Sequence, residues 1–402
     1  MQSVADALRA VLERVPRTAV ETVELGESVG RVLAVDVVAT RPLPGFDNSA
    51  MDGYAARSSE LPGTFPIAAV VPAGAPYVDP LPEQSVARIF TGAPMPPDLD
   101  TVVIQEDAAI VENNQVRLPS SPPGENVRRT GEDIAAGETV LAAGARIRPW
   151  DLGVLAAFGV DKVPVARPPR VALIATGDEL VDITQTPGPG QLVDSSAHAL
   201  AGLVREVGGI PHKVAIARDD ISALGSIIAS SLGYDVVITT GGVSVGDRDH
   251  VRAALAMSGV TLELWKVAMK PGKPFSFGTR PGAGGRPGTP VFGLPGNPIS
   301  TVVAFELFLR PALLAMQGAT AIERPRAPVQ LVRGYRKQAG RAHYIRARVV
   351  RNGEHLIAHP HPKQGSAMLS SLLGCNALVE LPAPQTEVLP GAVVQAILFE
   401  AI

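Results

Sequence analysis

The chain has 402 residues, 46% of them hydrophobic, and its 36 Lys+Arg against 39 Asp+Glu give a formal net charge of −3. At about 100–200 residues per domain this length predicts two to four domains, and the near-neutral balance argues against a generally basic nucleic-acid-binding protein. The single cysteine, Cys375, excludes an internal disulfide and a cysteine-based zinc site, and no uninterrupted apolar stretch reaches the ~18 residues of a membrane span. We therefore expect a cytoplasmic protein with neither a nucleic-acid nor a membrane partner.

The first part of the chain is predicted to be rich in strands and loops after one opening helix. Residues 4–15 repeat apolar side chains at helical spacing, and Ser3 is a suitable cap. From about residue 21 to residue 165, short alternating runs such as 101–104 lie between Pro, Gly and Asn clusters, a pattern typical of strands. One further short helix is predicted at 150–159.

A different rhythm begins at Arg170, where apolar strands alternate with helices. This alternation predicts βαβ units and a parallel sheet, whose ligands bind beyond the carboxyl ends of the strands. The loops to inspect for function are therefore those that follow the strands. The predicted strands are 171–175, 213–217, 235–239 and 291–292, and the predicted helices are 195–207, 221–232, 249–257 and 298–316.

The last part of the chain predicts a small terminal β domain. Four runs after Pro328 read as strands separated by turns, which is typical of a small barrel. The Gly/Pro-rich stretch 279–289 lies between two earlier strand signals, and we interpret it as a flexible hairpin tip. The four predicted strands are 330–333, 343–350, 377–381 and 393–398.

The stretch 239–249 is a glycine-rich turn between a buried strand and a helix. Gly241 and Gly242 would let backbone N–H groups approach an anion at the start of a helix. The stretch matches neither a Walker A loop nor a dinucleotide-binding fingerprint. An ordinary tight turn with Asp249 as helix cap explains the same residues, so both interpretations stay open here.

Two further loops carry candidate ligand-binding residues. Three lysines, Lys266, Lys270 and Lys273, lie on a loop stiffened by prolines, and such a loop suits phosphate or another oxyanion. A solvated surface loop is the alternative. Residues 293–298 join a strand to a helix and contain Pro295 and Pro298, where helix capping is a sufficient explanation. Their glycines also leave a bare backbone against which a flat ring could pack.

Acidic residues gather at the predicted strand ends. Carboxylates beside an anion site would repel the ligand unless a cation lies between them, and Mg²⁺ is the natural candidate. Helix capping is the alternative and is a good explanation for Asp220. The acidic residues in question are Asp178, Glu179, Asp219, Asp220, Asp247 and Asp249.

Eight motifs in order along the chain make it resemble the molybdopterin molybdenumtransferase family, and also the corresponding domain of gephyrin. Together they are specific, although each alone is weak, and the resemblance extends over essentially the whole chain. One departure is Asp194-Ser195-Ser196, where the family pattern has Asn at the third position. The motifs are DNSAMDGYA (47–55), TGAPMP (91–96), RRTGEDI (128–134), TGDEL (176–180), TTGGVSVGDRDHV (239–251), KPGKP (270–274), GLPGNP (293–298) and QGSAMLSSL (364–372).

The resemblance implies an α/β multidomain fold with four parts. Two strand-rich N-terminal parts are interleaved, an αβα sandwich binds the pterin, and a small β-barrel ends the chain. It also implies a homodimer whose active cleft is shared between subunits, and a transient contact with the molybdopterin adenylyltransferase. The expected boundaries are 1–46 with 134–168 for domain I, 47–133 for domain II, 169–324 for the sandwich and 325–402 for the barrel.

The implied reaction inserts molybdate into adenylated molybdopterin, with Mg²⁺ present and AMP released. Electrostatic positioning rather than a covalent nucleophile would carry it. The residues expected to act in catalysis are Asp52, Thr91, Asp133, Glu179, Asp219 and Lys270. Those expected to bind substrate are Arg128, Gly241, Gly242, Ser244, Lys266, Lys273, Pro295 and Pro298, and those expected to hold the metal are Glu179, Asp219 and Asp249.

Two other functions fit the same resemblance. A non-catalytic scaffold or pterin carrier could use the same fold, because fold does not fix function. The adenylyltransferase of the preceding step resembles residues 170–320 alone, and the additional domains of this chain argue against it. The acids and lysines at the predicted strand ends favour the transferase.

Overall fold

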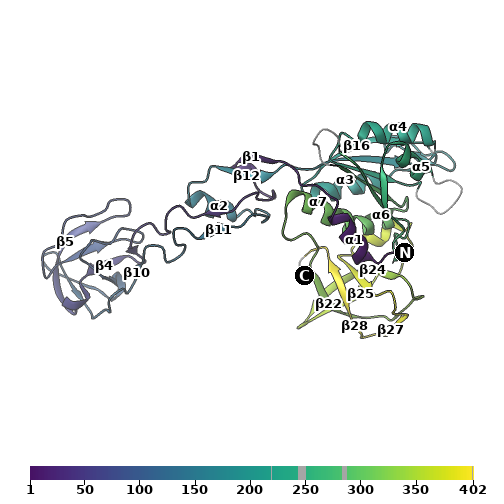
Figure 1. Ribbon diagram of the computed structural model, residues 1–402. Helices are drawn as coiled ribbons and strands as arrows, with labels where there is room; N and C mark the ends of the chain where they lie inside the picture. The colour runs from purple at the N-terminus through teal and green to yellow at the C-terminus, as the bar shows by residue number, and fades with distance from the viewer. Residues whose placement is uncertain (219, 243–249, 283–287, 401) are drawn as a thin grey trace. The chain divides into compact units, whose positions relative to one another are not determined.

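The computed structural model describes residues 1–218, 220–242, 250–282, 288–400 and 402 (Figure 1). The chain divides into two compact units, each with its own hydrophobic core. The first unit comprises Met1–Val35, Ala143–Pro149 and Lys162–Ile402, and the second comprises Asp36–Ala142 and Trp150–Asp161.

A six-stranded mixed sheet forms the centre of the first unit. Its order is β16-β13-β17-β21-β20-β18; the first four strands are parallel, and β20 is antiparallel to both of its neighbours, β21 and β18. The predicted parallel sheet is confirmed, whereas the edge strand β18 was not predicted. The strands are β13 (Arg170–Thr176), β16 (Ile210–Ala217), β17 (Val236–Thr240), β18 (Thr261–Trp265), β20 (Ser276–Arg280) and β21 (Thr289–Leu294).

Helices cover both faces of this sheet. Successive side chains of β13 enter different cores: Leu173 packs with α3 (Ser196–Glu206), and Ile174 packs with α4 (Ile221–Ser231) and α5 (His250–Met257). This alternation follows from the two-residue period of a strand. The predicted αβα sandwich is therefore confirmed, with α4 and α5 on one side and α3 on the other (Figure 1).

One long helical run lies on the α3 side of the sheet. It consists of α6 (Pro298–Ala304), a π-helical turn at Phe305–Leu309, and α7 (Arg310–Gln317). The run is long and apolar enough to cross a membrane, yet 89% of its 18-residue apolar segment is buried inside the fold. It is therefore a core helix of the sandwich.

A closed five-stranded barrel follows the sandwich. Strand β24 pairs with both β25 and β26, so the order β24-β25-β22-β28-β26 returns to its first strand. Closure leaves the barrel without a free edge and confirms the predicted terminal β domain. The strands are β22 (Arg326–Leu331), β24 (Ala342–Asn352), β25 (His355–Pro360), β26 (Ala377–Leu381) and β28 (Val393–Leu398).

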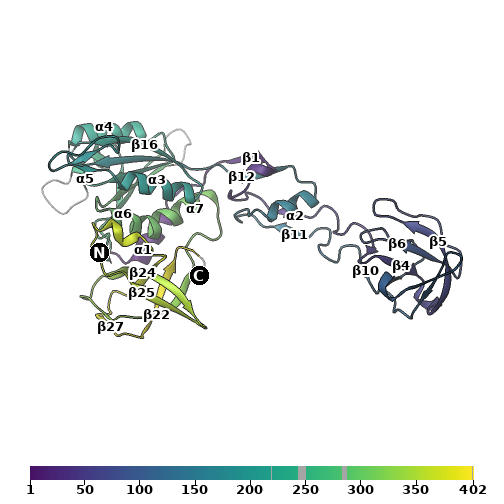
Figure 2. The ribbon, with the colours of Figure 1, turned by 180° about the vertical axis from the view of Figure 1, so that it is seen from behind.

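The second unit contains a separate six-stranded sheet, which confirms the strand-rich prediction (Figure 2). Its order is β7-β4-β6-β5-β9-β8, and β4 is buried along its whole length. The strands are β4 (Gly53–Ala56), β5 (Gly63–Val71), β6 (Val86–Ile89), β7 (Thr101–Ile104), β8 (Ala109–Val111) and β9 (Gln115–Leu118), and the helix α2 covers Asp151–Ala157.

Short strand pairs complete both units. Strand β1 (Val20–Glu24) pairs with β12 (Lys162–Ala166), so the chain leaves the first unit and returns to it, as an interleaved N-terminal region requires. The opening helix α1 begins at Val4 after its Ser3 cap but ends at Leu12, earlier than predicted. The other short strands are β2 (Val37–Val38), β3 (Asn48–Ser49), β10 (Val127–Arg128), β11 (Thr139–Leu141), β14 (Leu180–Val181), β15 (Leu192–Val193), β19 (Met269–Lys270), β23 (Tyr335–Arg336) and β27 (Glu387–Val388).

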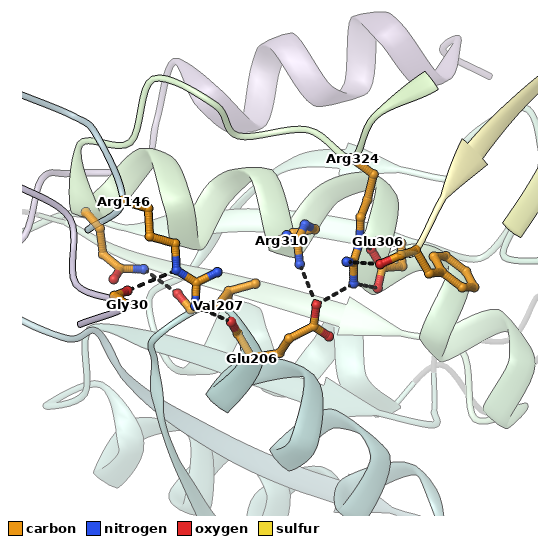
Figure 3. Close-up of polar contacts among 9 residues, drawn as sticks. Gly30, Arg146, Glu206, Val207, Glu306, Arg310 and Arg324 are labelled. Atoms are coloured by element: carbon orange, nitrogen blue, oxygen red, sulfur yellow. Dashed lines mark hydrogen bonds and ion pairs between the residues drawn. The ribbon is translucent and has the colours of Figure 1, made fainter. Parts of the chain in front are cut away.

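An ion-pair network with a buried carboxylate, Glu306, joins the sandwich to the barrel (Figure 3). Arg324 donates from Nε and Nη2 to the Glu306 carboxylate at 2.9 and 3.1 Å, and from Nη2 to Glu206 at 2.6 Å. Its Nη1 donates to the Phe399 carbonyl at 2.7 Å, and Arg310 also donates to Glu206 at 3.2 Å. The Glu306 side chain is only 2% exposed, so its charge depends on Arg324.

Arg324→Ala should lower the free energy of unfolding by about 3–5 kcal/mol, because it leaves the Glu306 carboxylate buried without its partner. Urea unfolding followed by circular dichroism measures this. Arg336→Ala is the matched control, since Arg336 is 85% exposed and pairs with Glu387 at 2.6 Å; we expect it to change stability by less than about 1 kcal/mol. Equal effects of the two substitutions would contradict the role given to Arg324.

Candidate functional site

A pocket of about 720 Å³ lies at the carboxyl ends of the parallel strands β13, β17 and β21. This is the place where open α/β sheets bind ligands. Five of the predicted site residues line it: Glu179, Gly241, Gly242, Pro295 and Pro298. The loops after β13, β17 and β21 therefore meet around one cavity.

The glycine-rich turn after β17 is closely packed, and neighbouring atoms leave no room for a side chain at either glycine. Gly241 has φ +90°, and a Cβ there would lie 2.3 Å from the Thr176 carbonyl oxygen. Gly242 has φ +64°, and its Cβ would lie 2.5 Å from Cγ2 of Val251. The turn thus presents bare backbone to the pocket. Ser244, predicted for the same turn, lies outside the described residues.

The segment between β21 and α6 forms another wall of the pocket. Pro295 is buried, and its carbonyl accepts the Thr301 hydroxyl at 2.7 Å. Asn297 occupies the cap position of α6, but its side chain makes no capping hydrogen bond. Capping therefore does not account for Asn297, which lines the pocket instead.

The predicted metal ligands are only partly described. Glu179 is exposed and lines the pocket, whereas Asp219 and Asp249 lie outside the described residues, as does Asp247. Within the described ranges, no group of three or more His, Cys, Asp or Glu side chains could hold a metal ion. Asp220 caps α4 by accepting from Ala223 N at 2.7 Å, as predicted.

A second pocket, of about 580 Å³, adjoins the first and shares Pro274, Pro295 and Asn297 with it. Its lining contains three cationic side chains and, among the described residues, no carboxylate. The cationic residues are Lys270, Lys273 and Arg341, with Tyr335, Gln364 and Ser366 beside them. A carboxylate-free pocket with three cations is suited to an oxyanion.

Lys266 differs from the other two predicted lysines. It lies between β18 and β19 with φ +71°, and its backbone N–H donates to the Phe275 carbonyl at 2.9 Å. The lysine loop is non-helical, as predicted, but Lys266 lines neither pocket.

The lysine loop is fastened to the barrel by a short parallel pairing. Met269 and Lys270 of β19 pair with Ala342 and His343 of β24. His343 is 6% exposed, and burial together with the charges of the nearby lysines and arginine lowers its pKa to about 4. A neutral histidine beside the pocket is the expected response to a strongly positive surrounding.

Arg346, which the sequence analysis did not select, holds the far wall of the second pocket. Its side chain is fully buried and donates to the carbonyls of Lys363 and Gly365 at 3.1 and 3.2 Å, and to Ser371 Oγ at 3.0 Å. Its own N–H donates to Gln364 at 3.2 Å. The motif 364–372 was the only sequence signal that this loop belongs to a site.

In the second unit, two predicted residues form one hydrogen-bonded pair. Asp52 Oδ1 accepts from both the backbone N–H and the hydroxyl of Thr91, each at 2.7 Å. These bonds, with a smaller contribution from the charge of Arg88, lower the pKa of Asp52 and keep it ionised. The side chains are accessible, so the pair is available to a ligand.

Arg128 and Asp133 lie on the neighbouring segment of this unit. Strand β10 places Arg128 opposite Asn48 of β3, and both Arg128 and Asp133 are exposed. Asp47 anchors the segment by accepting from Arg129 at 2.7 Å and from Thr130. The predicted site residues thus divide between the two units, and their roles remain predictions.

The αβα sandwich with a pocket at its strand ends places the chain in the class of α/β proteins that bind ligands at that edge of the sheet. Three family models match the chain in order. The MoeA N-terminal region (domain I and II) matches residues 2–159, a probable molybdopterin binding domain matches 172–315, and the MoeA C-terminal region (domain IV) matches 328–399.

Similar proteins agree with these matches. Molybdopterin molybdenumtransferase 2 of Mycobacterium tuberculosis is 36% identical over 409 residues, which is 98% of this chain and 99% of that protein. The molybdopterin molybdenumtransferase of a Nostoc species is 40% identical over 332 residues, 79% of this chain and 75% of that protein. A molybdopterin biosynthesis MoeA protein from Pyrococcus horikoshii has a solved structure with TM-score 0.86 at 31% identity, covering 99% of this chain and 100% of that one. The chain belongs to the molybdopterin molybdenumtransferase (MoeA) family.

His343 should make stability depend on pH. Between its unfolded pKa near 6.5 and its folded pKa of about 4, the unfolded chain binds a proton that the folded chain does not. The free energy of unfolding is therefore highest, as far as His343 determines it, above pH 6.5. It falls by about 3 kcal/mol as the pH drops toward 4. Urea unfolding at a series of pH values measures the slope.

His343→Gln should flatten this part of the pH profile. His359→Gln is the matched control, because His359 is an exposed histidine on the same barrel. A profile unchanged by the first substitution, or flattened equally by both, would show that His343 is not held neutral.

Proposed function

We propose that the protein inserts molybdate into adenylated molybdopterin and releases AMP, a late step of molybdenum cofactor biosynthesis. The observation that carries this proposal is the adjacency of two chemically different pockets. One presents bare glycine backbone at the strand ends, and the other presents three cations without a described carboxylate. Family membership supplies the substrate class.

In this proposal the first pocket holds the pterin substrate and the second holds molybdate. Bare backbone at Gly241 and Gly242 lets N–H groups and a flat ring approach closely. Lys270, Lys273 and Arg341 supply charged donors for a dianion. Molybdate displaces AMP as the dithiolene acquires molybdenum, and the residues act by positioning the two partners.

We further propose Mg²⁺ as the cation that offsets charge on the phosphoanhydride. Glu179, at the rim of the first pocket, is suited to a hard cation, and Asp219 and Asp249 are the other predicted ligands. When bound, the ion would neutralise phosphate oxygens. The protein's own contribution is the orientation of the substrate between the glycine turn and the lysine loop.

The test is AMP release from adenylated molybdopterin in the presence and absence of molybdate. We expect release to require molybdate and to stop when EDTA removes divalent cations, with Mg²⁺ restoring it. Molybdate-independent turnover, or ATP consumption with plain molybdopterin, would refute the transferase proposal. Full activity in EDTA would refute only the proposed role of Mg²⁺.

Lys270→Gln should weaken molybdate binding by about 1.5–3 kcal/mol in the same assay, the scale of a hydrogen bond to a charged group. The effect should appear as a raised molybdate requirement. Lys162→Gln is the control, because Lys162 is 59% exposed and its contact with Glu24 is 3.8 Å. An unchanged molybdate dependence in the first variant would remove Lys270 from the site.

We also propose, from family resemblance, a cytoplasmic homodimer in which the second unit of one subunit completes the site of its partner. A transient contact with the molybdopterin adenylyltransferase would deliver the substrate. Asp52 and Lys270 lie in different units of the chain, so they offer a test by complementation.

Mixing inactive Asp52→Ala and Lys270→Ala subunits should restore activity in a shared-site dimer. A mixed dimer would carry both lesions in one site and leave the other intact. Random exchange gives mixed dimers in half of the population, and the recovered activity approaches about one quarter of wild type. No recovery, when exchange is shown by mass spectrometry and both variants are folded, would mean that each subunit builds its site alone.

A further inference from the structure

Arg88 braces the loop pair that carries Asp52 and Thr91. It lies on β6 of the second unit, and its guanidinium lies 5.0 Å from the centre of the Tyr54 ring and 5.1 Å from that of Phe90. From this position Nη1 donates to the carbonyl of the residue after Asp52, Gly53, at 3.1 Å. Nη2 donates to the side-chain oxygen of Gln105 at 2.6 Å.

Each of these contacts leads to the Asp52–Thr91 pair. Gly53 directly follows Asp52, and Gln105 donates its backbone N–H to the Asp52 carbonyl at 3.0 Å. Phe90 directly precedes Thr91, which donates twice to Asp52 Oδ1. The Arg88 side chain therefore contacts residues next to both members of the pair: Gly53 on β4 beside Asp52, and Phe90 after β6 beside Thr91. It also contacts Gln105, in the turn after β7.

This arrangement leaves one oxygen of Asp52 available. Oδ1 accepts both bonds from Thr91, whereas Oδ2 receives no hydrogen bond from any residue that the structure describes. A carboxylate with one oxygen fixed and the other open has a defined orientation toward a ligand. Preset geometry of this kind is what positions a reacting group.

We propose that Arg88 is a positioning residue that holds Asp52 in its Thr91-bonded orientation, with Oδ2 turned to the reacting groups. The proposal rests on the proposed function, in which Asp52 is catalytic. It requires a guanidinium in particular. A planar guanidinium can lie over two rings while it donates in two directions, and the single ammonium of a lysine cannot reproduce this.

The competing explanation is that Arg88 merely stabilises the sheet. The two differ in one measurable respect. A residue that acts through Asp52 has nothing left to position once Asp52 is removed, so its effect on rate vanishes in the Asp52→Ala background. A purely structural residue lowers activity equally in both backgrounds.

The experiment compares Arg88→Gln, Arg88→Lys, Asp52→Ala and the double variant Arg88→Gln/Asp52→Ala in the AMP-release assay. We expect Arg88→Gln to lower kcat by on the order of 10- to 100-fold, the cost of a small misplacement, with KM changed less. The double variant should be no slower than Asp52→Ala. Arg117→Gln, which removes an exposed arginine from β9 of the same sheet, should keep full activity.

Nuclear magnetic resonance titration of the Asp52 carboxyl gives a second readout. Its pKa should rise in Arg88→Gln, though less than in Thr91→Val, and should stay low in Arg88→Lys, which retains the charge. The rate of Arg88→Lys should nevertheless stay reduced. This variant keeps the proposal testable if Arg88→Gln fails to fold.

Three outcomes would overturn the positioning role: full activity of Arg88→Gln, full rescue by Arg88→Lys, or an undiminished effect of Arg88→Gln in the Asp52→Ala background. These outcomes are distinct from a failure of the proposed function. If Asp52→Ala itself is fully active, the catalytic assignment of Asp52 is wrong, and the role of Arg88 falls with it.

Discussion

The parallel pairing of Met269–Lys270 with Ala342–His343 is the contact on which the cationic pocket depends. It fixes the lysine loop of the sandwich to β24, one of the two strands whose pairing closes the barrel. Lys270 and Lys273 thereby come to face the same cavity as Arg341, although the arginine belongs to a different layer of the fold. Two residues of strand pairing thus convert a lysine-rich loop into one wall of a binding pocket.

Concentrating these cations carries an electrostatic cost that the surrounding residues accommodate. His343 stays neutral because burial, with the charges of Lys270, Lys337 and Arg341, lowers its pKa to about 4. Lys337 donates its ammonium to the carbonyls of Arg341 and Ala383 at 2.9 and 3.1 Å, and burial lowers its pKa. Repulsion left in the empty pocket would be relieved by a bound dianion, so stability is exchanged for affinity, as is common at functional sites.

Local patterns predicted most of the sandwich, because its signals lie within single elements. Strand β13 extends one residue beyond the predicted 171–175 at each end, and Asp220 caps α4 as expected. Arg341 escaped prediction because only the β19 pairing with the barrel brings it to the lysine loop. Arg346 escaped because its partners, in the segment 363–371, are distant from it in sequence. Lys266 shows the converse: sequence proximity to Lys270 suggested a shared site, yet its backbone turn leaves it outside both pockets.

The pKa shifts near the predicted site favour positioning over proton transfer. A general acid or base works best when its pKa lies near the working pH. Here the hydrogen bonds from Thr91 lower the pKa of Asp52, and burial lowers the pKa of His343 to about 4. Both pKa values therefore lie well below pH 7. Near pH 7 one is a fixed anion and the other a fixed neutral group. Fixed charges suit a displacement at a phosphoanhydride, in which the protein orients charged partners and the leaving AMP needs no proton from a side chain.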